Sequence, residues 1–145
     1  MNTDLQELCS LLYGINYQVF LKLYEAHHAQ SAEPAGIMSA AFDTKVVVGG
    51  IAAVSQDEVL NEISTCLAYK GDESSGPIPK KLASAQFQIL KSKVLDETRT
   101  LCKEANLIFI FWLKEGHPAY PVWWDFAFLF QGETHSHILI GSSSD

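Results

Sequence analysis

The sequence predicts an α+β fold in a single domain that spans residues 1–145. The first two thirds place apolar residues three and four positions apart, which is typical of amphipathic helices. From Leu107 onward the pattern changes to short apolar and aromatic runs that are separated by glycine and proline. A chain of this length can bury one core without disulfides. We therefore expect three main helices packed on a C-terminal antiparallel β-meander.

The first helix is expected to begin at Thr3 or Asp4, since either side chain can cap it. Gly14 is a weak point at which two helices could meet instead. The segment 33–36 (EPAG) is expected to end the element. The helical spacing is carried by one apolar stripe: Leu5, Leu8, Cys9, Leu12, Ile15, Val19, Leu23 and Ala26.

Residues 37–54 allow several structures. The run 46–54 (VVVGGIAAV) could form a hairpin over residues 45–54 that turns at Gly49 and Gly50, because such turns need positive φ. A buried loop or a weak helix are the alternatives. The β-branched content favours extended structure.

Two further helices follow. Ser55 and Glu58 have the spacing of a capping box, which predicts a helix that begins at Ser55 and ends before Gly71. Residues 71–79 (GDESSGPIP) are expected to form a surface loop. Residues 80–105 then predict the third helix, with its apolar positions close to a heptad spacing and a face of mixed charge.

The C-terminal meander is predicted at residues 107–113, 122–130 and 135–140. The first two strands are apolar at almost every position, so we expect the centre of the sheet to be covered on both faces. The polar tail, residues 141–145, could be an unstructured end, or it could fix the edge of the last strand.

Charge and cysteine usage restrict the class of protein. The net charge is −7, and Arg99 is the only arginine. This excess of acidic residues argues against a nucleic-acid partner. It favours a basic partner, or it serves only to keep the protein soluble. Three separated cysteines without a C-x-x-C pattern indicate reduced thiols in a cytoplasmic protein. Neither a signal peptide nor a membrane-spanning run is expected.

Asp125 is the most unusual polar residue, since it stands within the aromatic run 122–128 (VWWDFAF). A carboxylate there could act as an acid, a base or an anchor for a basic group. Alternatively, it lies at a strand end and bonds backbone amides or a lysine.

His135 and His137 share one face of the last strand and could hold a metal if a third ligand approached, with His117 or Cys102 as candidates. No spacing rule supports this, so we predict no metal, no cofactor and no catalytic residue. A two-residue turn that pairs Gln131 with Thr134 would place Phe128 opposite His137. Asp125 would then lie on the other face from both histidines.

The stretch 120–145 (YPVWWDFAFLFQGETHSHILIGSSSD) resembles the final hairpins of small bacterial immunity proteins, which neutralise polymorphic or contact-dependent toxins. The resemblance covers about 26 residues and contains no diagnostic motif. It implies a compact, acidic, cytoplasmic and non-enzymatic inhibitor that binds a cognate toxin. No functional residue can be transferred by position from such a diverse group.

We therefore expect a protein-binding domain whose partner is a protein, for example a basic toxin domain. The alternative is a small-ligand-binding or hydrolytic domain that uses Asp125, His135 or His137 in an aromatic-lined pocket. The oligomeric state stays open. The expected partner contacts lie on surface loops, on the second helix and in the aromatic strand: Asp57, Glu58, Glu62, Glu73, Glu115, Tyr120, Trp123 and Asp125.

Overall fold

A computed structural model describes all residues, 1–145, as five helices and one five-stranded antiparallel sheet in the order β1-β5-β4-β3-β2. The predicted α+β class is confirmed. The helices are α1 (Asn2–Leu12), α2 (Pro34–Phe42), α3 (Gln56–Leu67), α4 (Pro79–Leu82) and α5 (Ala85–Glu104). The strands are β1 (Gln18–His27), β2 (Val47–Ala53), β3 (Leu107–Glu115), β4 (Asp125–Gln131) and β5 (His135–Ser144).

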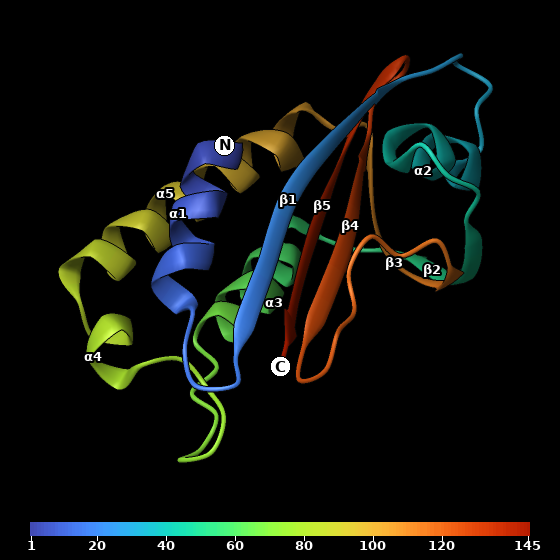
Figure 1. Ribbon diagram of the computed structural model, residues 1–145. Coiled ribbons are helices and arrows are strands. Elements are labelled where there is room, and N and C mark those ends of the chain that lie inside the picture. Colours follow the sequence, from blue (N-terminus) through green and yellow to red (C-terminus); the bar gives the residue numbers. More distant parts are fainter.

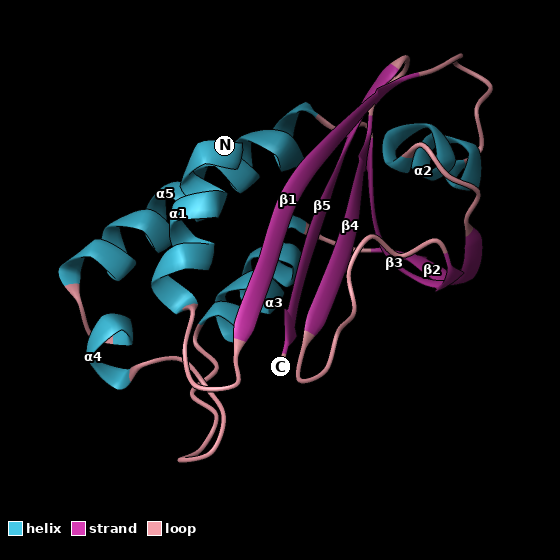
Figure 2. Cartoon of the chain, in the orientation of Figure 1, coloured by secondary structure: helices cyan, strands magenta, loops and turns pink.

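Helices cover both faces of the sheet. Figure 1 shows α1, α3 and α5 on one side and α2 on the other. Along β4, Phe126, Phe128 and Phe130 pack into the core under the three helices, whereas Ala127 and Leu129 pack into the core beside α2. The expected burial of the sheet centre on both faces is therefore confirmed. None of the helices, which Figure 2 shows flanking the sheet, is long and apolar enough to cross a membrane.

The prediction of one helical element from Thr3 to near Ala26 is wrong in its second half. The helix ends at Leu12, and Asn16 adopts a positive φ of 45° in the turn that follows. Residues 18–27 form β1, which pairs with β5 at ten positions. Pairing with a central strand supplies more buried surface and hydrogen bonds than a lone helical turn, so tertiary context overrides the helical spacing.

The segment after β1 contains a helix that the sequence did not predict. Pro34 begins α2 rather than ending the preceding element, since proline at the first helical position lacks only an N–H that would be unpaired anyway. Asp43 ends α2 in the left-handed conformation, with φ of 52°. α2 therefore provides the only helical cover on its face of the sheet.

The proposed hairpin at 45–54 is also wrong, although the segment is extended as favoured. Residues 47–53 form the single strand β2, which pairs with β3 and has a register shift between Val48 and Gly50. Gly49 and Gly50 do not adopt positive φ. They leave room for the Trp112 indole, because a Cβ at either position would overlap that ring.

The second predicted helix is confirmed with its capping box. The Glu58 amide donates to Ser55 Oγ at 3.2 Å, and the Ser55 amide donates to Glu58 Oε2 at 2.7 Å. The third predicted helix divides into α4 and α5 at Ser84, whose hydroxyl accepts a hydrogen bond from the Phe87 amide at 3.2 Å. A serine that caps one helix interrupts the helix before it.

The meander forms, with boundaries that differ from those predicted. β4 begins only at Asp125, and β5 continues through the serine tail to Ser144, which pairs with Gln18 of β1. Ser143 is fully buried, and its hydroxyl accepts from the Trp124 amide at 3.1 Å. The tail is thus ordered as the end of the last strand and pairs along that strand's edge with β1, so it is not an unstructured end.

Candidate functional site

The sheet forks between β3 and β4. These strands pair at only four positions, from Leu107 with Gln131 to Ile110 with Phe128. Beyond Ile110, β3 continues beside β2, while the first part of β4 has β5 as its only partner. Each strand therefore turns an unpaired backbone edge toward the fork, and residues 116–124 connect the two strands.

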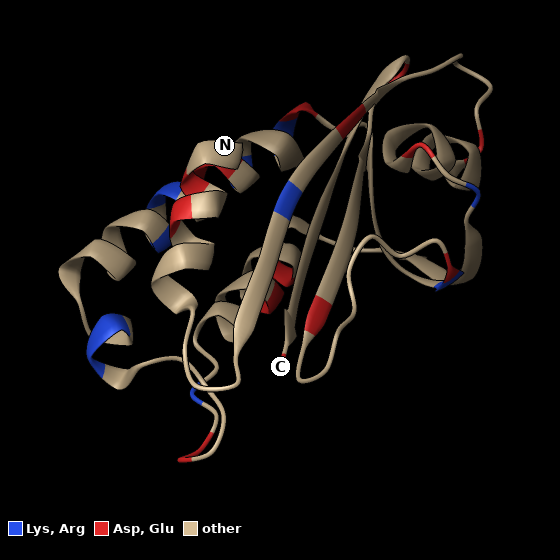
Figure 3. Cartoon of the chain, viewed as in Figure 1, with Lys and Arg blue, Asp and Glu red and all other residues tan.

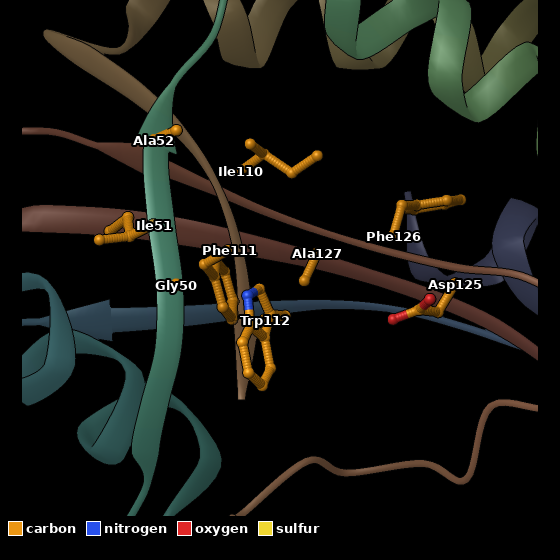
Figure 4. A pocket seen from close by; sticks show the side chains of 9 residues that line it. All are labelled: Gly50, Ile51, Ala52, Ile110, Phe111, Trp112, Asp125, Phe126 and Ala127. Atoms are coloured by element: carbon orange, nitrogen blue, oxygen red, sulfur yellow. The ribbon is translucent and has the colours of Figure 1, made fainter. Parts of the chain in front are cut away.

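A cleft of about 350 Å³ opens at this fork. It is lined by nine residues, seven of them hydrophobic, from β2 (50–52), β3 (110–112) and the start of β4 (125–127). Figure 4 shows Asp125 on the β4 wall, across the opening from Trp112 of β3. An apolar cleft with one placed charge is the usual form of a recognition site.

Trp112 is held at the cleft by the backbone of β2. Its indole lies against Gly49 and Gly50, and yet the residue stays 54% exposed. The β-bulge at Gly49 brings both glycines under the ring. The indole is thus fixed in position by backbone atoms while much of it faces solvent.

The opposite wall of the cleft is acidic. Asp125 is exposed, and its carboxylate has no ion-pair or hydrogen-bond partner within the chain. Burial, together with the charges of Glu62 and Asp125, raises the pKa of the Cys66 thiol to about 12. Glu62 lies on α3, on the helical side of the sheet, where the Cys66 thiol donates to its Oε1 at 3.8 Å. Figure 3 shows acidic residues on several elements, among them α1, α3 and the start of β4, whereas basic residues lie mainly on α4 and α5.

The other expected contact residues are dispersed. Asp57 and Glu58 lie in the first turn of α3, where Glu58 serves the capping box. Glu115 ends β3. Glu73 lies in the loop before α4, which projects from the helical side of the molecule (Figure 1).

The two expected aromatic contacts differ from each other. Tyr120, in the connection across the fork, is 80% exposed. Trp123 is half-buried and packs on Tyr17, with ring centroids 5.7 Å apart, so it is chiefly structural. Trp112 was not among the residues expected to contact a partner. The sequence signal that could have indicated its position is the pair Gly49 and Gly50. Glycine within an extended segment often marks the close approach of another group.

Asp125 and the two C-terminal histidines do not converge. β4 and β5 pair Asp125 with Ser142 and Phe130 with His137, so the expected register is wrong by two residues. A shift of two preserves the faces, and Asp125 does lie on the face opposite His137. The two also lie at opposite ends of the β4–β5 ladder. No single pocket holds both groups.

The third ligands considered for the histidines are also elsewhere. His117 Nδ1 is engaged by the Ala119 amide at 3.0 Å, and Cys102 is buried in the core, where burial raises its pKa. Glu25 of β1 lies beside His135 and His137 instead. The sequence pattern missed Glu25 because it placed that residue on a helix.

Comparisons of the chain with protein-family models, with curated proteins and with solved structures give no match. The function therefore has to be argued from the geometry of the chain itself.

Proposed function

We propose that this chain is a non-enzymatic protein-binding domain, an immunity-type inhibitor that binds and neutralises a basic toxin domain in the cytoplasm. The observation that carries the proposal is the cleft at the fork of the sheet. It combines apolar walls, a half-exposed Trp112 and the unpaired carboxylate of Asp125. Tryptophans held in this way are typical of binding hot spots.

The occupant that fits the cleft best is an arginine of the partner. Its planar guanidinium can stack on the Trp112 indole while it pairs with the Asp125 carboxylate. The net charge of −7 would steer a basic protein toward this surface.

The same cleft is poorly equipped for hydrolysis. Asp125 is the only ionisable side chain among its nine lining residues. Acid–base or nucleophilic catalysis needs a second group within hydrogen-bond reach. This supports binding over the alternative of a hydrolytic site at Asp125.

The proposal can be tested by placing a photo-crosslinking amino acid at residue 112 of the full chain in its native host. Residue 89 on α5 provides a matched control, because Ile89 is an apolar side chain that is 67% exposed away from the cleft. We expect one stoichiometric protein to crosslink from residue 112 and not from residue 89.

The captured protein is then produced alone and together with the chain. We expect this protein to be basic and to be toxic when it is produced alone. Wild type and Ile89→Ala should neutralise it, whereas Trp112→Ala combined with Asp125→Asn should not. A captured protein that is harmless, or that the cleft variant neutralises as well as wild type does, would overturn the proposal.

A further inference from the structure

A second cluster of polar side chains lies across β1 and β5. The register pairs Glu25 with His137 and His27 with His135. Residues that are directly opposite in an antiparallel ladder project from the same face, and so do residues two positions apart on one strand. Four side chains capable of binding a metal or supporting its ligands therefore gather on one patch of the sheet.

Three of these side chains converge. Glu25 Oε2 is 3.1 Å from His135 Nε2 and 3.8 Å from His137 Nε2. One ligand atom of each of the three residues lies within 4.8 Å of the others. In a tetrahedral zinc site, with bonds of about 2.0–2.2 Å, neighbouring ligand atoms are roughly 3.3–3.5 Å apart. Small side-chain adjustments would bring all three donors to one ion.

We propose that Glu25, His135 and His137 form a binding site for a divalent transition-metal ion of the zinc class. Two imidazoles and one carboxylate suit such an ion better than they suit magnesium or calcium, which prefer oxygen donors alone. Ligands from two strands would also join β1 to β5 across the ladder.

The surroundings of the three ligands support an ion. The His27 ring stacks on His135 with centroids 4.3 Å apart and planes 6° apart, which holds the His135 ring in position.

Space for a fourth ligand lies next to the histidines. A pocket of about 170 Å³ is lined by His135, His137 and, from the last turn of α5, Glu104. Either a water or the Glu104 carboxylate can complete a tetrahedral set. The C-terminal end of α5 also carries a partial negative charge that favours a cation.

The test is calorimetric titration of the tag-free chain with Zn²⁺, together with its melting temperature with and without the ion. The site variants are Glu25→Gln and the double substitution His135→Gln with His137→Gln. Glu133→Gln, at an exposed acid in the β4–β5 turn, and His117→Gln serve as matched controls.

We expect wild type and both controls to bind one Zn²⁺ and to melt at a higher temperature in its presence, because the ion binds only the folded ladder. Glu25→Gln should weaken binding at least tenfold, and the double variant should abolish both effects. Circular dichroism and the melting temperature without zinc check that the variants fold. Failure of the wild type to bind stoichiometrically, or undiminished binding by a folded double variant, would show that Glu25 and the histidines form only an ion pair. Neither result bears on the cleft at the fork.

Discussion

Strand β4 lies between β3 and β5, but it pairs with both of them along only part of its length. With β5 it pairs at six positions, from Asp125 to Phe130, whereas with β3 it pairs at only four. Where both neighbours are present, its side chains are buried on both faces. Where β3 departs, the sheet opens into a cleft with a half-exposed Trp112 and an unpaired Asp125. One strand thus belongs to the core along most of its length and lines an open cleft at its beginning, which we propose as the recognition surface.

The largest expected effect is in the paired part of β4. Phe128 is 1% exposed and lies between Phe126 and Phe130, with ring centroids 5.6 and 6.5 Å away. Phe128→Ala should lower the free energy of unfolding by about 3–5 kcal/mol, because it removes buried area and leaves a cavity. Urea denaturation measures this loss. A loss below about 1 kcal/mol would mean that the core under the helices is not tightly packed there.

A smaller effect is expected at the fork, where Gly49 supports Trp112. The three atoms nearest to a Cβ at Gly49 all belong to that indole. Gly49→Ala should therefore cost about 1–3 kcal/mol of stability through overpacking. In a Trp112→Ala background the same change should be close to neutral, since no ring remains to displace. A double-mutant cycle measures the difference, and additive costs would refute the contact.

The helical layer offers a pH-dependent comparison. Lys93 Nζ donates to Asp4 Oδ1 at 3.1 Å, and this bond holds the pKa of Asp4 below its ordinary value of 3.8. Asp4 therefore contributes stability that is present above pH 3.8 and is lost as the pH falls through its lower value in the folded protein. Burial raises the pKa of the neighbouring Glu97. The stability contribution of Glu97 therefore changes with pH in the direction opposite to that of Asp4.

We expect the stability advantage of wild type over Asp4→Asn to shrink as the pH falls from about 5 to about 2. Thermal unfolding of both proteins across this range measures it. An advantage that stays constant with pH would show that the α1–α5 ion pair contributes nothing. Binding at the fork should be the same in both proteins near neutral pH.

The smallest expected effect is at Tyr120, which is 80% exposed in the connection across the fork. Tyr120→Ser should change the free energy of unfolding by no more than about 0.5 kcal/mol. Comparing the stability loss of Tyr120→Ser with that of Phe128→Ala contrasts an exposed and a buried aromatic residue of the same C-terminal region. A loss of about 2 kcal/mol or more on urea denaturation would place Tyr120 in a structural role.

Local patterns predicted those elements whose signals do not depend on distant partners. Ser55 and Glu58 defined the start of α3 because a capping box closes within four residues. The apolar runs of β3 and β4 predicted a sheet covered on both faces. The faces of Asp125 and His137 were also correct, because the observed register differs from the expected one by two residues, and a shift of two preserves the faces.

Features that depend on tertiary pairing were missed. Val19, Leu23 and Ala26 fit a helical spacing, and only the ladder with β5 makes their segment a strand. That error concealed the approach of Glu25 to the histidines. The sequence left open whether the serine tail is ordered, because its burial depends on pairing with β1. The fork itself arises because β3 and β4 separate beyond Ile110. No local sequence pattern encodes the point at which two strands separate.

The most direct test of the central claim is the affinity of the chain for the protein captured at residue 112, measured by calorimetry for wild type, Asp125→Asn and Glu73→Gln. Both substitutions remove one exposed negative charge, but only Asp125 lies in the cleft. We expect Asp125→Asn to raise the Kd at least tenfold and to make binding less sensitive to salt, whereas Glu73→Gln should change the Kd less than about threefold. Equal effects of the two substitutions would contradict the claim that the cleft at the fork is the recognition site.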